Sequence, residues 1–382
     1  MPAPVMEIPF NRPQLVGDEH AYIDEALAGG KLSGNGKFGL RCADWLERRL
    51  RSKRALITPS CTASLEMACL LAELKPGDEV IVPDFGFVST ANAFALLGAV
   101  PVFVDVDADT LNIDPQAVEN ALTERTRAIV VIHYGGVACA MDRIVQLADS
   151  HDLLVIEDAA HALEATDRDR PLGSIGHLAT LSFHETKNVQ CGEGGALLVN
   201  DPRLVARAEI IQEKGTDRSR FFRGEIDKYT WQDTGSSYLL SEVAAAFLWA
   251  QLEHAGRITS ERRAIWHRYN DAFAPLELAG AFRRPVVPLD CTHSGHLFYL
   301  LLPTEELRDR TLDRLAARGV RAVFHYLPLH SSPGGKRYGR LGGPVPVTID
   351  ASSRLLRLPI WGGMREEQVE YVIDSVLEVA GG

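Results

Sequence analysis

The sequence predicts an α/β fold in which helices cover a mostly parallel sheet, followed by a smaller C-terminal α+β domain. Short apolar runs rich in β-branched residues alternate with helical spacing over most of the chain. From about Leu252 the pattern changes to long charged helices with a few strands between and after them. The 382 residues also exceed the usual size of one compact domain. We therefore expect a large domain over residues 1–251 and a small domain over residues 252–382.

The expected elements follow one another in a regular order. Six apolar runs predict strands buried on both faces: Ile81–Pro83, Val102–Val106, Ala128–Tyr134, Leu153–Glu157, Ala179–Phe183 and Ala196–Val199. Helical spacing between them predicts the helices Ala63–Leu74, Ala91–Leu97 and Met141–Ser150. The small domain should contain the helices Ile258–Phe273 and Glu305–Arg318 and the strands Leu297–Leu302 and Val320–Phe324. In such a fold, ligands collect at the carboxyl ends of the parallel strands.

The composition is ordinary for a soluble enzyme and argues against several other classes of protein. The formal net charge of −11 disfavours a general nucleic-acid or membrane-surface binder, although it allows a local basic pocket. Six cysteines without CxxC spacing favour reduced thiols over a zinc site or a disulfide framework. The first residues lack the basic region and the long apolar region of a signal peptide. No run approaches the ~18 apolar residues of a membrane span. We expect a cytoplasmic protein that binds no metal.

An aspartate and a lysine carry the clearest chemical signal. Asp158 closes the apolar run that begins at Leu153, and Lys187 lies 29 positions later in a loop of small residues. The pair suits pyridoxal 5'-phosphate, because a lysine amine can join its aldehyde and a carboxylate can keep its pyridine nitrogen protonated. Taken alone, the pair also fits an ordinary strand end followed by an unrelated loop lysine.

Three further motifs accompany this pair. In Thr58–Ala68 small hydroxyl residues open a helix, so that Thr62 and free amides can cradle a phosphate, although a simple N-cap also explains the pattern. The segment Pro83–Thr90 follows a strand and can place a phenylalanine either against a flat heterocycle or in the core. His161 lies close enough to Asp158 to share its pocket, or it is a structural histidine.

The order of these motifs resembles that of the sugar-nucleotide aminotransferases of the DegT/DnrJ/EryC1/StrS family. The resemblance extends from Ile8–Asn11 to Leu356–Pro359. It is strongest to one branch, the dTDP-4-amino-4,6-dideoxygalactose transaminases, which act on dTDP-4-keto-6-deoxyglucose. The stretches that carry the likeness to this branch are Thr58–Ala68, Phe87–Phe94, Ser182–Asn188, Phe221–Gly224, Asp227–Trp231 and Phe324–His330.

The resemblance implies a fold-type-I aminotransferase that uses pyridoxal 5'-phosphate and works as a homodimer with shared active sites. It implies that Lys187 joins the cofactor and carries protons, that Asp158 pairs with the pyridine nitrogen and that His161 lies over the cofactor or near its hydroxyl group. The implied ring and phosphate contacts come from Phe87, Thr62, the Ala63 amide, Ser182 and Ser237. Many members have asparagine where this chain has Ser237, so a phosphate contact across the subunit interface is left open.

The reaction implied is transfer of an amino group from L-glutamate to the C4 ketone of dTDP-4-keto-6-deoxyglucose. It runs as two half-reactions with ping-pong kinetics, because the same lysine serves both substrates. Basic and aromatic side chains of two segments are the candidates for holding the dTDP-sugar: Arg220, Arg223, His325, Tyr326 and His330. For the arginine-rich segment the alternative is a solvated surface loop.

Three alternative functions are weighed against this one. A sister aminotransferase would form the equatorial amine, dTDP-4-amino-4,6-dideoxyglucose, or use a related 4-keto sugar in natural-product glycosylation. A related branch dehydrates at C3 and has histidine at the position of Lys187. A protein that binds the cofactor without catalysis would be expected to lack Lys187 or Asp158, and this chain has both.

Overall fold

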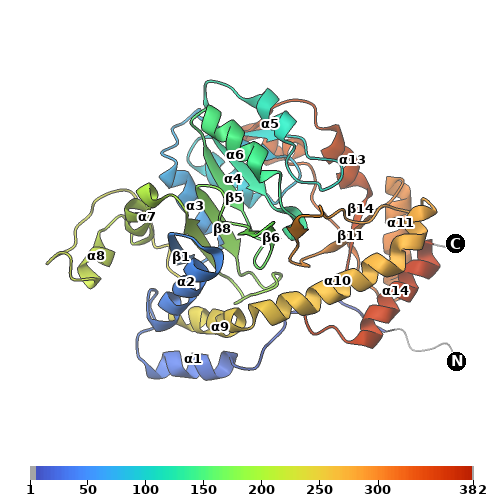
Figure 1. Cartoon of the computed structure of the whole chain (residues 1–382), viewed down its shortest axis with the longest axis horizontal. Coiled ribbons are helices and arrows are strands. Elements are labelled where there is room, and N and C mark those ends of the chain that lie inside the picture. The colour runs from blue at the N-terminus through green and yellow to red at the C-terminus, as the bar shows by residue number, and fades with distance from the viewer. Residues whose placement is uncertain (1–5, 381–382) are drawn as a thin grey trace.

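The computed structural model describes residues 6–380, and an eight-stranded sheet lies at its centre (Figure 1). Its strands, in spatial order, are β1 (Arg54–Thr58), β9 (Gly195–Val199), β8 (Leu178–Ser182), β5 (Leu154–Asp158), β4 (Thr126–Ile132), β2 (Glu79–Pro83), β3 (Val100–Val104) and β13 (Arg340–Leu341). β9 runs antiparallel to both of its neighbours, and the other pairings in the sheet are parallel. The prediction of a mostly parallel sheet is therefore confirmed.

Helices cover both faces of this sheet. One face packs against α3 (Cys61–Leu71), α4 (Ser89–Leu96) and α7 (Val205–Gln212). The other face packs against α2 (Lys37–Leu50), α5 (Pro115–Ala121), α6 (Met141–Ser150) and α9 (Glu242–Glu253), with α1 (Glu19–Ala28) beside α9. Leu197 belongs to the first of these cores and Leu198 to the second, as the alternation of a pleated strand requires. Burial on both faces is why the strands read as continuous apolar runs.

The C-terminal part of the chain builds a second, antiparallel sheet with a core of its own. Its strands, in spatial order, are β11 (Phe298–Leu301), β14 (Leu355–Leu358) and β12 (Val323–Phe324). Its core is completed by α10 (Ala255–Leu278), α11 (Glu305–Ala317) and α14 (Glu366–Ala380). In Figure 1 the long helix α10 runs from α9 to the end of the molecule that carries α11 and α14. Further elements are the small sheet of β10 (Cys291–Thr292), β6 (Thr166–Asp167) and β7 (Arg170–Pro171), and the helices α12 (Pro333–Tyr338) and α13 (Pro346–Arg354).

The structure departs from the predicted elements in a few places. Helix α10 continues to Leu278 although it contains Pro275, because a proline in the last turn removes only one donor from a helix that is about to end. The expected strand Val320–Phe324 is reduced to the two residues of β12. Two strands of the large sheet were not expected: β1, and β13, which the C-terminal segment adds to the edge of that sheet beside β3.

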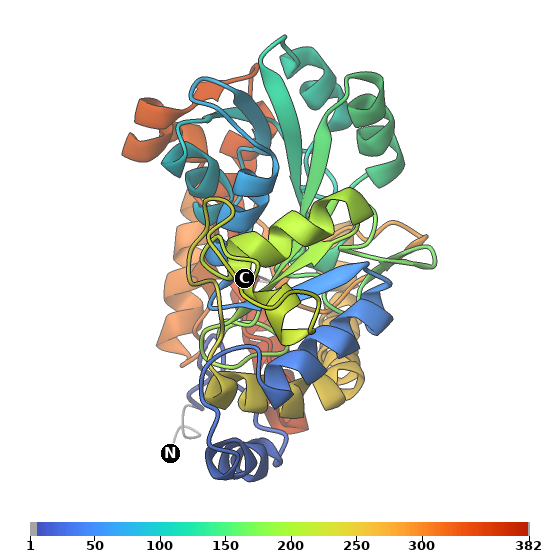
Figure 2. The same cartoon turned by 90° about the vertical axis from the view of Figure 1, so that its left-hand side faces the viewer.

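The arginine-rich segment around Arg220 and Arg223, for which a solvated surface loop was the alternative, contains a short helix, α8 (Arg218–Phe222). It projects from the end of the molecule opposite α14 (Figure 1), and Figure 2 looks onto that end. Large aromatic side chains are exposed on this segment, including Phe222 and Trp231, of which the latter is 80% exposed. A helix of this length at the surface has little core of its own to hold it.

Candidate active site

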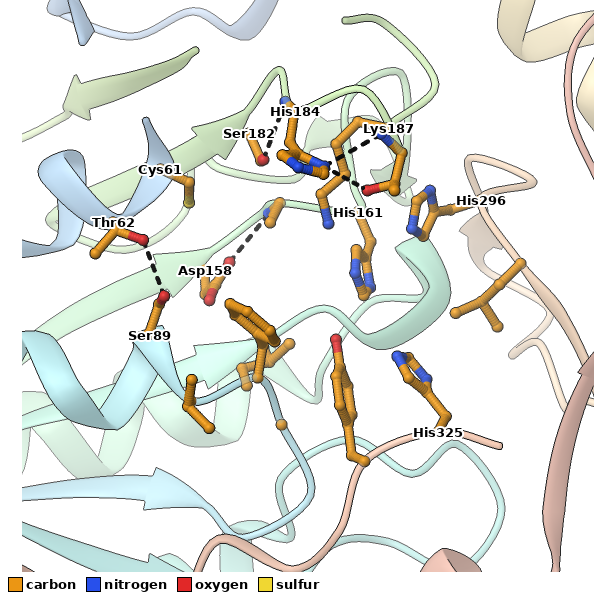
Figure 3. A pocket seen from close by; sticks show the side chains of 18 of the residues that line it. Cys61, Thr62, Ser89, Asp158, His161, Ser182, His184, Lys187, His296 and His325 are labelled. Atoms are coloured by element: carbon orange, nitrogen blue, oxygen red, sulfur yellow. Dashed lines mark hydrogen bonds between the residues drawn. The ribbon is translucent and has the colours of Figure 1, made fainter. Parts of the chain in front are cut away.

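A cavity of about 840 Å³ opens at the carboxyl ends of β4, β5 and β8. Segments far apart in the chain meet there: the amino end of α3, the loops after β2 and β8, the segment around β12 and the strand β14. Figure 3 shows several of the side chains that line it, and they point toward one another from these different elements. The position agrees with the sequence-based expectation that a ligand would bind at the carboxyl edge of the sheet.

Asp158 ends β5 at the wall of this cavity. Its carboxylate is held from two sides: the Thr90 hydroxyl donates to Oδ2 at 2.6 Å, and the Ala160 backbone N–H donates to Oδ1 at 3.1 Å. The residue is 6% exposed. Thr90 lies in the first turn of α4, so the helix fixes the direction of the carboxylate. The result is a buried negative charge with a defined orientation toward the cavity.

Lys187 enters the same cavity from the loop after β8. Two backbone bonds close this loop, from Cys191 N–H to Phe183 O and from Lys187 N–H to His184 O, each at 2.9 Å. Burial lowers the pKa of the Lys187 amine because its charged form loses water, while the nearby Asp158 carboxylate acts in the opposite direction. The geometry therefore favours an amine that can shed its proton inside the pocket.

Hydroxyl groups gather where α3 begins at the cavity wall. Ser60 caps the helix, since its Oγ accepts from the Ala63 N–H at 3.1 Å. The Thr62 hydroxyl lies 2.9 Å from the Ser89 hydroxyl on α4 (Figure 3). Gly195 starts β9 directly behind this helix end, where an added Cβ would lie 2.4 Å from the carbonyl carbon of Ser60. A helix amino terminus surrounded by hydroxyls suits a phosphate group.

Three buried histidines, His161, His296 and His325, line the cavity, and a fourth, His293, packs against Trp266. His161 and His296 stack with ring centroids 4.2 Å apart, and His325 shares a hydrogen bond of 2.7 Å with the Tyr134 hydroxyl. Burial lowers the pKa of His161, His296 and His325 well below the usual range. Burial also lowers the pKa of His293 to about 4. We refer to these four as the neutral histidines.

Two phenylalanines that the sequence could not distinguish have different environments. Phe85 is in the core, 1% exposed, against Tyr134 and Tyr326. Phe87 lines the cavity and is 56% exposed, so one of its faces is open to a flat ligand. Tyr326 also lines the cavity, with a positive φ of 29° that is uncommon for a residue with a side chain.

The structure brings together many of the residues predicted from the sequence, but not all of them. The cavity is lined by Lys187, Asp158, His161, Thr62, Phe87, Ser182, His325 and Tyr326. Five predicted residues do not reach its lining in this chain: Ala63, Arg220, Arg223, Ser237 and His330. Ser237 forms a bridge with Glu213 outside it. The arginines of the α8 segment pair with acidic neighbours instead: Arg220 with Glu225, and Arg223 with Glu225 and Glu209.

His330 and the Ala63 amide are each engaged by a side chain of this chain. His330 does not line the cavity, because its Nδ1 lies 2.5 Å from the fully buried carboxylate of Asp84 and its N–H donates to the same side chain. The Ala63 amide is already engaged by the Ser60 cap. A phosphate contact from Ala63, and substrate contacts from Arg220, Arg223 and His330, remain predictions.

Sequence reasoning missed several residues that line or support the site. Ser89 and Thr90 lie within the Phe87–Phe94 stretch, but nothing in the sequence showed that they face Thr62 and Asp158. His296 lines the cavity and lies 2.9 Å from the Asn188 amide oxygen, one residue beyond Lys187. Arg357 lies within Leu356–Pro359, the last segment of the resemblance. The sequence did not show that its side chain lies on the face of β14 that lines the cavity.

This donor set fits pyridoxal phosphate. An amine of lowered pKa, an oriented carboxylate, a helix amino terminus with hydroxyls and an open aromatic face surround one cavity. The model of the DegT/DnrJ/EryC1/StrS aminotransferase family matches residues 13–377. The chain belongs to this family. The protein SpsC of Bacillus subtilis, named for spore coat polysaccharide biosynthesis, is 32% identical over 98% of this chain and 97% of its own length.

Solved structures agree with this membership. The aminotransferase TlmJ of Streptoalloteichus hindustanus is 31% identical, with a TM-score of 0.89 over 98% of this chain and 99% of its own. Spr1654 of Streptococcus pneumoniae, in its PLP form, is 25% identical with a TM-score of 0.89 over 98% of this chain and 99% of its own. The chain is thus an aminotransferase with the α/β fold of this family, and pyridoxal phosphate is its cofactor.

Two other features bear on the class of protein. Of the helices formed by residues 6–380, none combines the length and the apolar character that crossing a membrane requires. Within the same residues, histidine, cysteine and acidic side chains form no cluster of three that suits a metal ion.

Proposed function

We propose that this aminotransferase acts on the C4 ketone of a nucleotide sugar. The reaction is dTDP-4-keto-6-deoxyglucose plus L-glutamate giving dTDP-4-amino-4,6-dideoxygalactose plus 2-oxoglutarate. The observation that carries the proposal is the convergence of Lys187 and Asp158 on one cavity of about 840 Å³. A cavity of this size suits a cofactor together with part of a sugar substrate. The relationship to SpsC, a polysaccharide biosynthesis protein, favours a carbohydrate acceptor.

The proposed catalytic roles follow from the chemistry of the site. When bound, pyridoxal phosphate supplies an electron sink that stabilises negative charge on the carbon next to the transferred nitrogen. Lys187 holds the cofactor at rest and, once displaced by the amino substrate, moves the proton on that carbon. The lowered pKa of its amine suits this task because a proton carrier must be neutral to accept. Asp158 keeps the pyridine nitrogen protonated, and Thr90 orients that carboxylate.

The remaining cofactor contacts are assigned by position. His161 lies beside Lys187 and is proposed to border the cofactor, as a neutral ring stacked on His296. Phe87 offers the open aromatic face against which a heterocycle packs. The phosphate is proposed to lie at the amino end of α3, with contacts from Thr62, Ser182 and the Ala63 amide, and with Ser237 contributed across a subunit interface.

A homodimer with shared active sites is part of the proposal. The projecting α8 segment exposes Phe222 and Trp231, and a second subunit would cover such apolar surface. From there Arg220 and Arg223 would reach the nucleotide part of the substrate bound to the other subunit. His325 and Tyr326 line the cavity of the same chain and are proposed to contact the sugar, with His330 beside them.

We also retain, as proposals, the division into domains 1–251 and 252–382 and a cytoplasmic location. The division is supported by the core that β11, β12 and β14 form with α10, α11 and α14.

A sister activity that forms the equatorial amine is the second candidate, because Lys187 serves both products. The C3-dehydrating branch is disfavoured by the lysine itself, and a non-catalytic role by the presence of both Lys187 and Asp158.

The deciding experiment is NMR of the product formed from dTDP-4-keto-6-deoxyglucose and L-glutamate. A small H3–H4 coupling identifies the axial amine of the galactose product. A large coupling would assign the glucose product, and the absence of an aminated sugar would refute the proposed acceptor.

A further inference from the structure

Asp84 is a buried carboxylate that no step of the proposed reaction uses. It follows β2 directly and is fully buried, and its backbone N–H donates to Val104 O at 2.9 Å, at the end of β3. Burial raises the pKa of its carboxyl group because the charged form loses water, while His330 acts in the opposite direction. A buried carboxylate is costly unless hydrogen-bond donors engage its oxygens.

Three hydrogen bonds join Asp84 to one short segment of the C-terminal part of the chain. The His330 N–H donates to Asp84 Oδ1 at 2.8 Å, and His330 Nδ1 lies 2.5 Å from Oδ2. Since an ionised carboxylate only accepts, the proton of this second bond belongs to Nδ1. The Leu329 N–H donates to the Asp84 carbonyl oxygen at 3.0 Å. The segment is therefore joined firmly to the end of β2.

This segment forms one wall of the active-site cavity. Residues 325–328 lie between β12 and the short 3-10 turn Leu329–Ser331, outside any regular element. Tyr326 has a φ of 29°, and a residue with a side chain needs surrounding contacts to hold it in that conformation. Before Tyr326, His325 Nδ1 lies 2.7 Å from the Tyr134 hydroxyl. Contacts at both ends of the segment therefore hold Tyr326 in place.

Aromatic contacts join the same two parts of the chain. The centroid of the Tyr326 ring lies 5.5 Å from that of Phe85 and 6.5 Å from that of Phe87. Phe85 directly follows Asp84, and Phe87 lines the cavity. A shift of the segment away from Asp84 would therefore move Tyr326 relative to Phe87 within the cavity.

The position of the segment indicates which ligand it contacts. His325 and Tyr326 line the cavity. Phe324 and Leu327, on either side of them, are 54% and 69% exposed, which places this wall at the opening. An amino-acid donor is small enough to lie beside the cofactor, whereas a nucleotide sugar must extend from its reacting C4 toward the opening. The wall therefore fits the sugar substrate, whose orientation a few polar groups can fix.

We propose that Asp84 and His330 are positioning residues for the sugar half-reaction, because their pair holds His325 and Tyr326 where the nucleotide sugar binds. This inference deepens the proposed function, on which it rests for the identity of the acceptor. Asp84 has no exposed surface, so it can affect a substrate only through the segment that it holds.

The test is a double-mutant cycle with Asp84→Asn and His330→Ala. Two residues that act through one contact have effects that do not add. Each single variant should raise the KM for dTDP-4-keto-6-deoxyglucose about tenfold, as expected when the wall is in place only part of the time. The double variant should raise it by the same factor.

Direct contact between His330 and the substrate predicts a different result. His330→Ala would then raise the KM as much in the Asp84→Asn background as in the wild type, and such additive effects would overturn the proposal. His330→Asn places an amide N–H where Nδ1 lies, so it should restore the KM to within about threefold of the wild-type value. A KM for His330→Asn as high as that for His330→Ala would also overturn it.

A matched control and the other half-reaction separate positioning from general support of the fold. Arg340 joins the same two parts of the chain, through an ion pair with the fully buried Glu79 at the opposite end of β2. Arg340→Gln should therefore leave the KM for the nucleotide sugar unchanged. Single-turnover reaction of the holoenzyme with L-glutamate should change less than about threefold in Asp84→Asn and His330→Ala. Equal loss in both half-reactions, an unchanged sugar KM in Asp84→Asn, or an equal rise in Arg340→Gln would each overturn the assignment.

Hydrogen exchange of the wall gives a readout that does not depend on the acceptor. In the holoenzyme, the amides of residues 325–330 should exchange about tenfold faster in Asp84→Asn and in His330→Ala, and no faster still in the double variant. Exchange at the wild-type rate would overturn the positioning role. If exchange changes as expected but the wild type aminates no dTDP-sugar, the proposed acceptor fails while the positioning role stands. If His330→Ala does not fold, the comparison of Asp84→Asn with Arg340→Gln decides the question.

Discussion

Replacement of Thr90 by valine tests how the site holds its buried carboxylate. Thr90→Val keeps the size and branching of the side chain and removes the hydroxyl that donates to Asp158 Oδ2 at 2.6 Å. Thr90 is 1% exposed and Asp158 is 6% exposed, so water cannot easily replace the lost donor. A hydrogen bond to a charged group contributes about 1.5–3 kcal/mol, and we expect Thr90→Val to lower the free energy of unfolding by that amount.

The assay is urea unfolding of the apoprotein at neutral pH, with Thr62→Val as the control. The Thr62 hydroxyl pairs with the neutral Ser89 hydroxyl at a partly exposed position, so its loss should cost about 1 kcal/mol or less. The holoenzyme of Thr90→Val should also turn over more slowly, because Asp158 is less firmly oriented. A loss of stability below about 0.5 kcal/mol, or one equal to that of Thr62→Val, would refute the reasoning.

The other predictions concern charge at and around the site. Asp158→Asn should bind cofactor yet slow both half-reactions about 100-fold or more, because an amide cannot keep the pyridine nitrogen protonated; near-normal single-turnover rates would show that the pairing residue is misassigned. Alanine at Arg220 or Arg223 should raise the KM for the nucleotide sugar about tenfold and spare the glutamate half-reaction, whereas equal loss in both would place the segment in support of the cofactor. The four neutral histidines have lower pKa values in the folded chain than in the unfolded chain. The unfolded chain therefore binds more protons below about pH 6.5, and the apoprotein should lose stability as the pH falls further. Each histidine should lower the free energy of unfolding by up to about 1.4 kcal/mol per pH unit. Urea unfolding at pH 7.5 and 5.5 checks this, and equal stability at both would contradict neutral burial.

Local sequence patterns were enough to predict six of the eight strands of the large sheet and the two central residues of the site. The strands are buried on both faces, so each appears as an apolar run that needs no knowledge of its neighbours. Asp158 was found because it ends such a run, and Lys187 because it lies in a loop of small residues. The edge strand β13 was missed because two residues carry no periodic signal, and its pairing with β3 depends on where the C-terminal segment folds back.

Contacts between distant segments could not be predicted in this way. Thr90 reaches Asp158 across 68 positions, through the packing of α4 beside the sheet. His330 was expected at the substrate, but Asp84 engages it 246 positions away, and the burial of that carboxylate is not visible in the sequence. The inward direction of Arg357 follows from the register of β14 with β11, which is a property of the folded chain.

The most direct test of the account is the identity of the lysine that holds the cofactor. Borohydride reduction of the yellow holoenzyme, followed by peptide mapping, should place the pyridoxyl label on Lys187, within the segment that begins at Ser182. Lys187→Ala should retain the fold and lose both the label and turnover. A label on any other lysine, or a labelled Lys187→Ala variant, would contradict the account.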